Sequence, residues 1–136
     1  MIMILCNELR LGNYFLLDGQ PHRVSMLNGT RHGDTTVGYE DEGDQHQHTC
    51  TPAQLQPVPL NEELLKQAGF RYHPYFQFWQ KIDMGPEGRS EMDIDRDYNV
   101  IDFMRRPIVK GISSLHQLQN IFYSLKGKEL EVDWEK

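Results

Sequence analysis

Three residues with zinc-binding side chains occupy alternate positions in one stretch of the chain. His46, His48 and Cys50 lie two residues apart, so in an extended strand they point to one face. A zinc site takes four ligands, and the sequence has neither a paired cysteine motif nor a second histidine cluster to supply the fourth. We therefore expect no metal and no cofactor, and this row supports only an alternative, a metal or small-molecule site. The simpler interpretation is a half-exposed polar strand with Cys50 in the core.

Aromatic residues gather between Phe70 and Ile82, a stretch that we predict to be a single strand. On one strand Tyr75 and Trp79 share a face, and Lys81 continues it. Such a face could stack bases, sugars or a peptide. The alternative is core packing, because a domain this polar needs its large aromatics inside. If the protein is an interaction module, we expect Tyr75 or Trp79 to be exposed, with Lys81 beside it.

A polar stripe follows the helix predicted over residues 115–126. His116, Gln119, Asn120 and Tyr123 are spaced i, i+3, i+4 and i+7, which places them on one side of the helix. These donors and acceptors could line a ligand cleft, so all four are candidate binding residues. More commonly such a stripe is a hydrogen-bonded seam that docks the helix, since buried polar groups must be paired.

Composition and motifs narrow the function classes. The net charge of -6 disfavours nucleic acid as the partner, because duplex binders usually carry a basic surplus. No apolar stretch is long enough to span a membrane. Met1 to Cys6 is too short for a signal peptide, and we predict that it forms a buried first strand. We therefore expect a cytoplasmic protein whose thiols are reduced. The common nucleophile, phosphate-binding, zinc-protease and dinucleotide motifs are missing, so we assign no catalytic residue, and the sequence favours a non-enzymatic protein.

Local sequence patterns predict the elements that would position these residues, and together these elements make an α+β fold. Runs at 14–17, 23–27, 35–39 and 45–50, separated by turn signals such as Asp18-Gly19, predict an antiparallel β-meander or SH3-like barrel over residues 1–60. A short helix over 61–68, capped by Asn61, follows. Antiparallel strands and a C-terminal helix that buries Leu118 and Phe122 complete an α+β part over 61–136. We expect one compact domain over residues 1–136, with only a soft subdivision at residue 60.

Three segments carry a resemblance to a known family, in the same order along the chain. Ser114 to Leu130 is similar to the C-terminal signature of an uncharacterised family of small proteins from Bacteroides-like gut bacteria and their phages or mobile elements. Asn7 to Tyr14, and Pro57 to Leu65 with Gly69-Phe70, resemble the same family. The resemblance implies a single-unit architecture and a mobile-element origin, and it carries over no catalytic residue.

The residues themselves predict a non-enzymatic interaction module that binds protein, peptide or nucleic acid. We expect it to act through the N-terminal meander or the aromatic stretch, and a protein or peptide partner is favoured.

Overall fold

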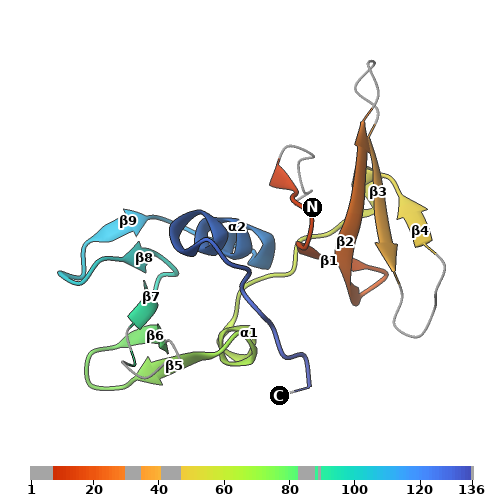
Figure 1. Cartoon of the computed structure of the whole chain (residues 1–136). Helices are drawn as coiled ribbons and strands as arrows, with labels where there is room; N and C mark the ends of the chain where they lie inside the picture. The colour runs from red at the N-terminus through yellow and green to blue at the C-terminus, as the bar shows by residue number, and fades with distance from the viewer. Residues whose placement is uncertain (1–7, 30–34, 41–46, 83–87, 89, 136) are drawn as a thin grey trace. The chain divides into compact units, whose positions relative to one another are not determined.

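A computed structural model describes residues 8–29, 35–40, 47–82, 88 and 90–135 of the 136-residue chain (Figure 1). The chain divides into two units: Met1–Pro59 with Ser114–Asn120, and Leu60–Ser113 with Ile121–Lys136. This division assigns the start of the C-terminal helix to the first unit, which nothing in the sequence predicts. The expectation of one compact domain stays a prediction. The strand predicted over Met1 to Cys6 lies outside the described residues.

The first unit is built on an antiparallel sheet with the strands in sequence order. Its strands are β1 (Tyr14–Leu17), β2 (Gln20–Gly29), β3 (Thr35–Glu40) and β4 (Gln47–Cys50). Asp18 and Gly19 connect β1 to β2 with φ angles of 53° and 78°. Positive φ at both central residues is what a tight hairpin turn requires, so the Asp-Gly signal predicts this hairpin correctly. The buried side of the unit contains Leu9, Phe15, Val24, Val37, Cys50 and Leu55.

A closed barrel would pair the outer edge of β1 with β4, whereas an open meander would not. After β4 the chain forms a short 3₁₀ turn (Pro52–Gln54) and returns to β1. There Leu16 N donates to Gln56 O at 2.8 Å, and Gln56 N donates to Leu16 O at 3.0 Å. Among the described residues β4 does not pair with β1; the edge of β1 is covered by this bridge and by Gln119 Oε1, which accepts from Tyr14 N at 2.8 Å. The β-meander is therefore confirmed.

The second unit begins with helix α1 (Glu62–Gln67), which the predicted cap starts: Asn61 Oδ1 accepts a hydrogen bond from Leu64 N at 2.8 Å. An antiparallel sheet in sequence order follows. Its strands are β5 (Phe70–His73), β6 (Phe78–Ile82), β7 (Ser90–Asp95), β8 (Val100–Ile101) and β9 (Pro107–Val109). The unit buries Leu64, Leu65, Phe70, Trp79, Met92, Ile94, Val100, Phe122 and Leu130. The α+β class is thus confirmed.

The prediction that residues 70–82 form one strand is wrong, because the stretch is a hairpin. His73 pairs with Phe78, so Pro74, Tyr75, Phe76 and Gln77 form the loop. Gln77 N donates to His73 O at 2.7 Å, and Gln77 has a φ of 59°. The physical reason is Pro74, which has no backbone N–H for a strand ladder and a φ already suited to a turn. Tyr75 and Trp79 therefore do not share a strand face.

Helix α2 (Leu115–Lys126) has the predicted bounds. Leu115, Leu118 and Phe122 are fully buried, as the periodicity predicts, whereas Leu125 in the last turn is 52% exposed. Gly127 ends the helix with a φ of 70°, a left-handed conformation in which glycine has no Cβ to strain. Within the described part of the chain, neither helix has the length and apolar character needed to cross a bilayer.

Candidate functional site

The most exposed aromatic residues of the second unit include those at the end of the β5–β6 hairpin. Tyr75 is 88% exposed and Phe76 is 50% exposed. Their ring centroids lie 4.9 Å apart in an edge-to-face arrangement, and the Phe78 centroid lies 6.4 Å from that of Phe76. We call Tyr75, Phe76 and Phe78 the aromatic tip. Because aromatic pairs of this geometry stabilise one another, the tip presents its rings in a defined arrangement.

Arg105 lies over the aromatic tip. Its guanidinium carbon is 4.4 Å from the ring centroid of Phe76 and 5.8 Å from that of Phe78. The β8–β9 loop that carries Arg105 is organised by Asp102, whose carboxylate accepts hydrogen bonds from Met104 N, Arg106 N and Arg106 Nε at 2.9, 2.9 and 3.1 Å. The Arg106 N–H, with the Arg106 charge and the Met104 N–H, holds the pKa of Asp102 below its usual value.

Another arginine reaches the same hairpin loop from the turn between β7 and β8. Arg96 Nη1 donates to Gln77 Oε1 at 3.3 Å. Two cationic side chains from neighbouring connections therefore contact the loop that carries Tyr75 and Phe76. Arginine over an aromatic face is an attractive arrangement, and it places positive charge beside exposed rings.

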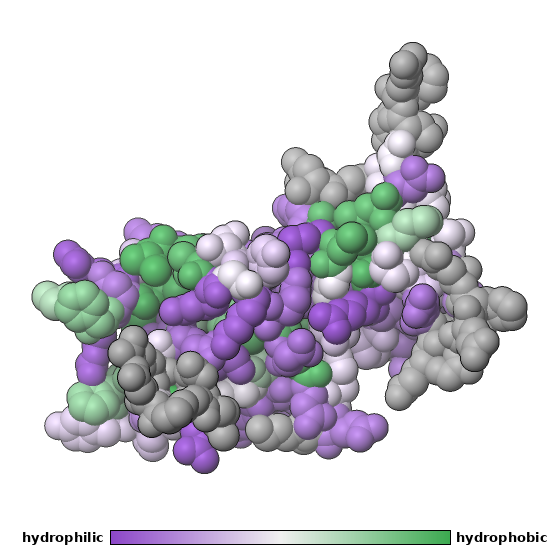
Figure 2. Space-filling model, in the orientation of Figure 1, coloured by the Kyte–Doolittle hydropathy of each residue, from purple (hydrophilic) through white to green (hydrophobic). Residues whose placement is uncertain are grey.

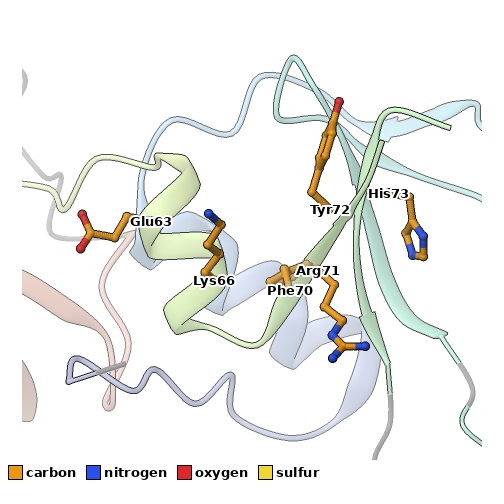
Figure 3. A pocket seen from close by; sticks show the side chains of 6 residues that line it. All are labelled: Glu63, Lys66, Phe70, Arg71, Tyr72 and His73. Carbon is orange, nitrogen blue, oxygen red and sulfur yellow. The ribbon is translucent and has the colours of Figure 1, made fainter. Parts of the chain in front are cut away.

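An open cleft of about 760 Å³ lies between α1 and β5 (Figure 3). Its lining residues are Glu63, Lys66, Phe70, Arg71, Tyr72 and His73. In Figure 3, Lys66 projects from α1 into the space before the strand, whereas Tyr72 and His73 leave β5 on opposite sides. The cleft continues into a smaller depression of about 390 Å³ that shares Lys66 and Tyr72 and also includes Arg96.

The walls of this cleft combine an apolar surface with exposed positive charge. Phe70 is buried and Tyr72 is 37% exposed, with its ring centroid 5.1 Å from that of Trp79. Lys66 and Arg71 are exposed, and within the described part of the chain neither forms an ion pair. Two cations stand against the one carboxylate of Glu63, in a chain whose net charge is -6.

A hydrophobic area also covers the part of the second unit that holds β8 and β9 (Figure 2). Phe103, Ile108 and Leu125 are 89%, 54% and 52% exposed. They line a depression of about 330 Å³. Unlike the aromatic tip, this area has no cation stacked on an aromatic ring among the described residues.

The other residues predicted from the aromatic stretch lie away from the tip. Trp79 is only 4% exposed and belongs to the core. Lys81 pairs with Phe70 at the end of the hairpin opposite to Tyr75, and its Nζ donates to Ala68 O at 3.0 Å. The expectation that Lys81 lies beside the exposed aromatic ring is therefore wrong, because it assumed one uninterrupted strand.

The polar stripe of α2 forms a seam within the first unit. Gln119 is fully buried: its Oε1 accepts from Tyr14 N at 2.8 Å, and its Nε2 donates to Gly12 O at 2.9 Å. Asn120 Oδ1 accepts from Asn13 Nδ2 at 2.8 Å. These bonds use the polar atoms that a ligand would need, so the structure gives both side chains a role in docking the helix.

The two ends of the stripe differ from its centre. His116 is buried, and its Nε2 lies 3.1 Å from Glu8 Oε2. Tyr123 is 44% exposed and belongs to the second unit. The four candidate residues therefore do not form one binding surface within either unit.

The metal row is described only in part, because His46 lies outside the described residues. His48 stacks on Tyr39 with the ring centroids 5.5 Å apart. Cys50 is 7% exposed in the core of the first unit, and burial raises the pKa of its thiol, which disfavours the thiolate that binds metals. Among the described residues, no group of three or more histidine, cysteine, aspartate or glutamate side chains lies close enough together to hold a metal ion.

Sequence reasoning missed Phe76, Arg105 and the cleft residues Lys66 and Arg71. Pro74 between two aromatic runs was the available signal for the hairpin. No local pattern predicts that Arg105, far along the chain, stacks on Phe76. No family model, curated protein or solved structure matches the chain significantly. The resemblance to the family from gut bacteria and mobile elements therefore stays a prediction.

Proposed function

We propose that the chain is a non-enzymatic interaction module that binds a protein or peptide through the aromatic tip. The observation that carries the proposal is the 88% exposure of Tyr75 beside a half-exposed Phe76. Leaving such rings in water forgoes burial worth about 25 cal/mol per Å². Contiguous exposed apolar groups rimmed by polar ones commonly mark contact surfaces. Tyrosine and arginine are also the residue types that carry much of the energy at protein interfaces.

The charge around the tip favours a protein or peptide over nucleic acid. Arg96, Arg105 and Arg106 supply three cations in these connections, and they are matched by the three carboxylates of Asp95 at the end of β7, Asp97 and Asp102. A phosphate backbone would meet these carboxylates and the net charge of -6. A protein partner can instead place apolar side chains on the rings and a few polar groups at the rim.

The test compares what the tagged wild-type protein and a Tyr75→Ser/Phe76→Ser variant retain from a native lysate treated with nuclease. We expect a partner that the wild type retains and the variant loses, with binding at least about 30-fold weaker, as for an interface hot spot worth about 2 kcal/mol. Leu11→Ser is the matched control, because Leu11 is 54% exposed in the other unit.

Two results contradict the proposal. In one, the tip variant and the wild type retain the same proteins. In the other, every partner that the wild type retains from an untreated lysate is absent when the lysate is treated with nuclease, which assigns the binding to nucleic acid. Unchanged thermal melting of the tip variant establishes that loss of binding is not loss of folding.

A further inference from the structure

We propose that the outer edge of β5 binds an extended acidic peptide segment of the partner as an added β-strand, in the cleft between α1 and β5. This inference rests on the proposed function and names the class of partner segment that the second unit recognises. It concerns the cleft rather than the aromatic tip, so the two can be tested separately.

The position of β5 in the sheet supplies the first argument. β5 is the end strand of the order β5-β6-β7-β8-β9, and among the described residues it pairs with β6 alone. The outward-facing backbone groups of an edge strand are a template for another strand. Binding domains that add a peptide strand to a sheet edge use these groups for affinity and the alternating side chains for specificity.

The lining of the cleft shows that it follows this edge. All four consecutive residues of β5, Phe70 to His73, line the same cleft. Successive side chains of a strand point to opposite faces, and Figure 3 shows this for Tyr72 and His73. The cleft therefore contacts consecutive residues whose side chains point to both faces, which is the arrangement expected where a cleft follows the edge of a strand.

The junction between α1 and β5 is a turn at Gly69. Gly69 joins them with a φ of 92°, and a Cβ built at this position would lie 2.7 Å from Lys81 Nζ. Lys81 Nζ in turn donates to Ala68 O at 3.0 Å. The chain therefore turns sharply at a residue that only glycine accommodates without strain, and the strand leaves the helix with its outer edge lining the cleft.

Charge determines the kind of peptide that fits. Lys66 from α1 and Arg71 from β5 are exposed on the two sides of the cleft. A second copy of this chain would bring two Arg71 side chains to one short ladder, and like charges at an edge disfavour such pairing. An acidic segment gains attraction from the same cations. Alternating acidic and β-branched residues match the strand best, because Arg71 and Tyr72 lie on opposite faces.

The probe is a fluorescein-labelled peptide of three Glu-Val repeats, long enough at about 20 Å to cover the four-residue β5. We expect saturable binding to the full chain by fluorescence anisotropy. A Lys-Val peptide of the same length should bind at least tenfold more weakly. Added salt should weaken the binding of the Glu-Val peptide, because exposed charges are screened. No binding of the Glu-Val peptide at about 1 mM, or equal binding of the Lys-Val peptide, overturns the proposal.

Two methylated probes test the backbone contact directly. One carries N-methyl groups on its three glutamates and the other on its three valines. Alternate N–H groups of a strand point to opposite edges, so we expect one methylated peptide to lose binding at least tenfold and the other to retain it. Retention by both indicates docking through side chains only, and loss by both indicates no defined edge. Either result overturns strand addition.

Protein variants connect the probe to the cleft. Arg71→Glu should weaken the binding of the Glu-Val peptide at least tenfold. Lys110→Glu, the same charge change at an exposed residue that follows β9 at the other side of the sheet, should not. Equal effects of the two variants overturn the assignment to β5.

The tip variant separates the two proposals. If the peptide fails to bind while Tyr75→Ser/Phe76→Ser still loses its lysate partner, the strand addition is wrong and the interaction module stands. If the peptide binds in the way described but the tip variant keeps the partner, the tip is wrong as the contact surface.

Discussion

Replacement of Trp79 and of Tyr75 by alanine should separate the core of the second unit from its proposed contact surface. The two aromatic residues lie four positions apart in one hairpin, yet Trp79 is 4% exposed and Tyr75 is 88% exposed. A tryptophan buried to this degree removes about 200 Å² of largely apolar surface from water, which corresponds to about 5 kcal/mol. An unfolded chain already buries part of that area. The expected loss for Trp79→Ala is therefore about 3–5 kcal/mol.

That loss is a large fraction of the 5–15 kcal/mol that stabilises a typical domain. For Tyr75→Ala we expect a change within about 0.5 kcal/mol, because the ring makes little contact to lose. Urea unfolding followed by tryptophan fluorescence measures both variants: Trp134 alone emits in Trp79→Ala, whereas Trp79 and Trp134 both emit in Tyr75→Ala, and both tryptophans belong to the second unit. Trp134 belongs to the second unit, and its backbone O accepts a hydrogen bond from Gln67 Nε2 at 3.1 Å. The signal therefore reports the unfolding of that unit.

Acrylamide quenching gives an independent check on Trp79. In a Trp134→Phe variant, the remaining tryptophan should emit at short wavelength and be quenched poorly, since it is buried against Tyr72. A red-shifted, readily quenched emission would refute the burial of Trp79. A free energy of unfolding that Trp79→Ala leaves unchanged, or that Tyr75→Ala lowers by more than about 1 kcal/mol, would refute the division of the hairpin into core and surface.

Three further predictions concern the seam, the cysteine and the β8–β9 loop. Gln119→Leu leaves the Tyr14 N–H without its partner, whereas Gly12 O keeps the hydrogen bond that Arg23 Nε donates at 3.1 Å. We therefore expect a loss of about 1–3 kcal/mol, measured by calorimetry; an unchanged melting temperature contradicts the seam. In a Cys6→Ser background, Cys50 should react with a thiol reagent far faster in urea than in buffer, because burial raises its pKa and blocks access; fast reaction of the folded protein contradicts its place in the core. Asp102 has a lowered pKa, so the ordering of its loop should be present above the usual carboxyl pKa of about 3.9 and be lost as the pH falls through the lower folded value. The loss of loop order can be followed in an NMR pH titration through the ring-current shifts that Phe76 induces on the Arg105 side chain. Arg105 shifts that do not change with acid contradict the prediction.

Local signals predicted three features of the elements correctly. Asp18-Gly19 determines its hairpin through two positive φ angles, Asn61 caps α1, and the apolar spacing of Leu118 and Phe122 gives the buried face of α2. Each of these depends on residues within a few positions of one another. The miss at Pro74 is of the same local kind, since a proline between two aromatic runs favours a turn over a continuous strand.

The candidate site depended on contacts that no local pattern contains. Arg105 in the β8–β9 loop stacks on Phe76 in the β5–β6 loop. Lys66 of α1 and the residues of β5 line one cleft, and Gly69 forms the turn between the two elements. The polar spacing in α2 did predict a seam as the commoner interpretation. It did not identify the partners of Gln119, which lie more than 100 residues earlier in the chain. Register, burial and long-range pairing decide these features, and they become visible only when the chain is folded.

Three turns of the second unit, including the one that carries the aromatic tip, contain non-glycine residues with positive φ angles. Among the described residues, the non-glycine positions with positive φ are Asp18, Gln77, Tyr98 and Arg105. The last three lie in the three turns that join β5 to β6, β7 to β8 and β8 to β9. Left-handed conformations of such residues cost about 1 kcal/mol or more each and cluster at functional sites. Arg96 from the second of these turns and Arg105 from the third both contact the first. The left-handed turns, the converging arginines and the exposed aromatics therefore lie together in the second unit, and the proposed contact with a partner rests on this combination.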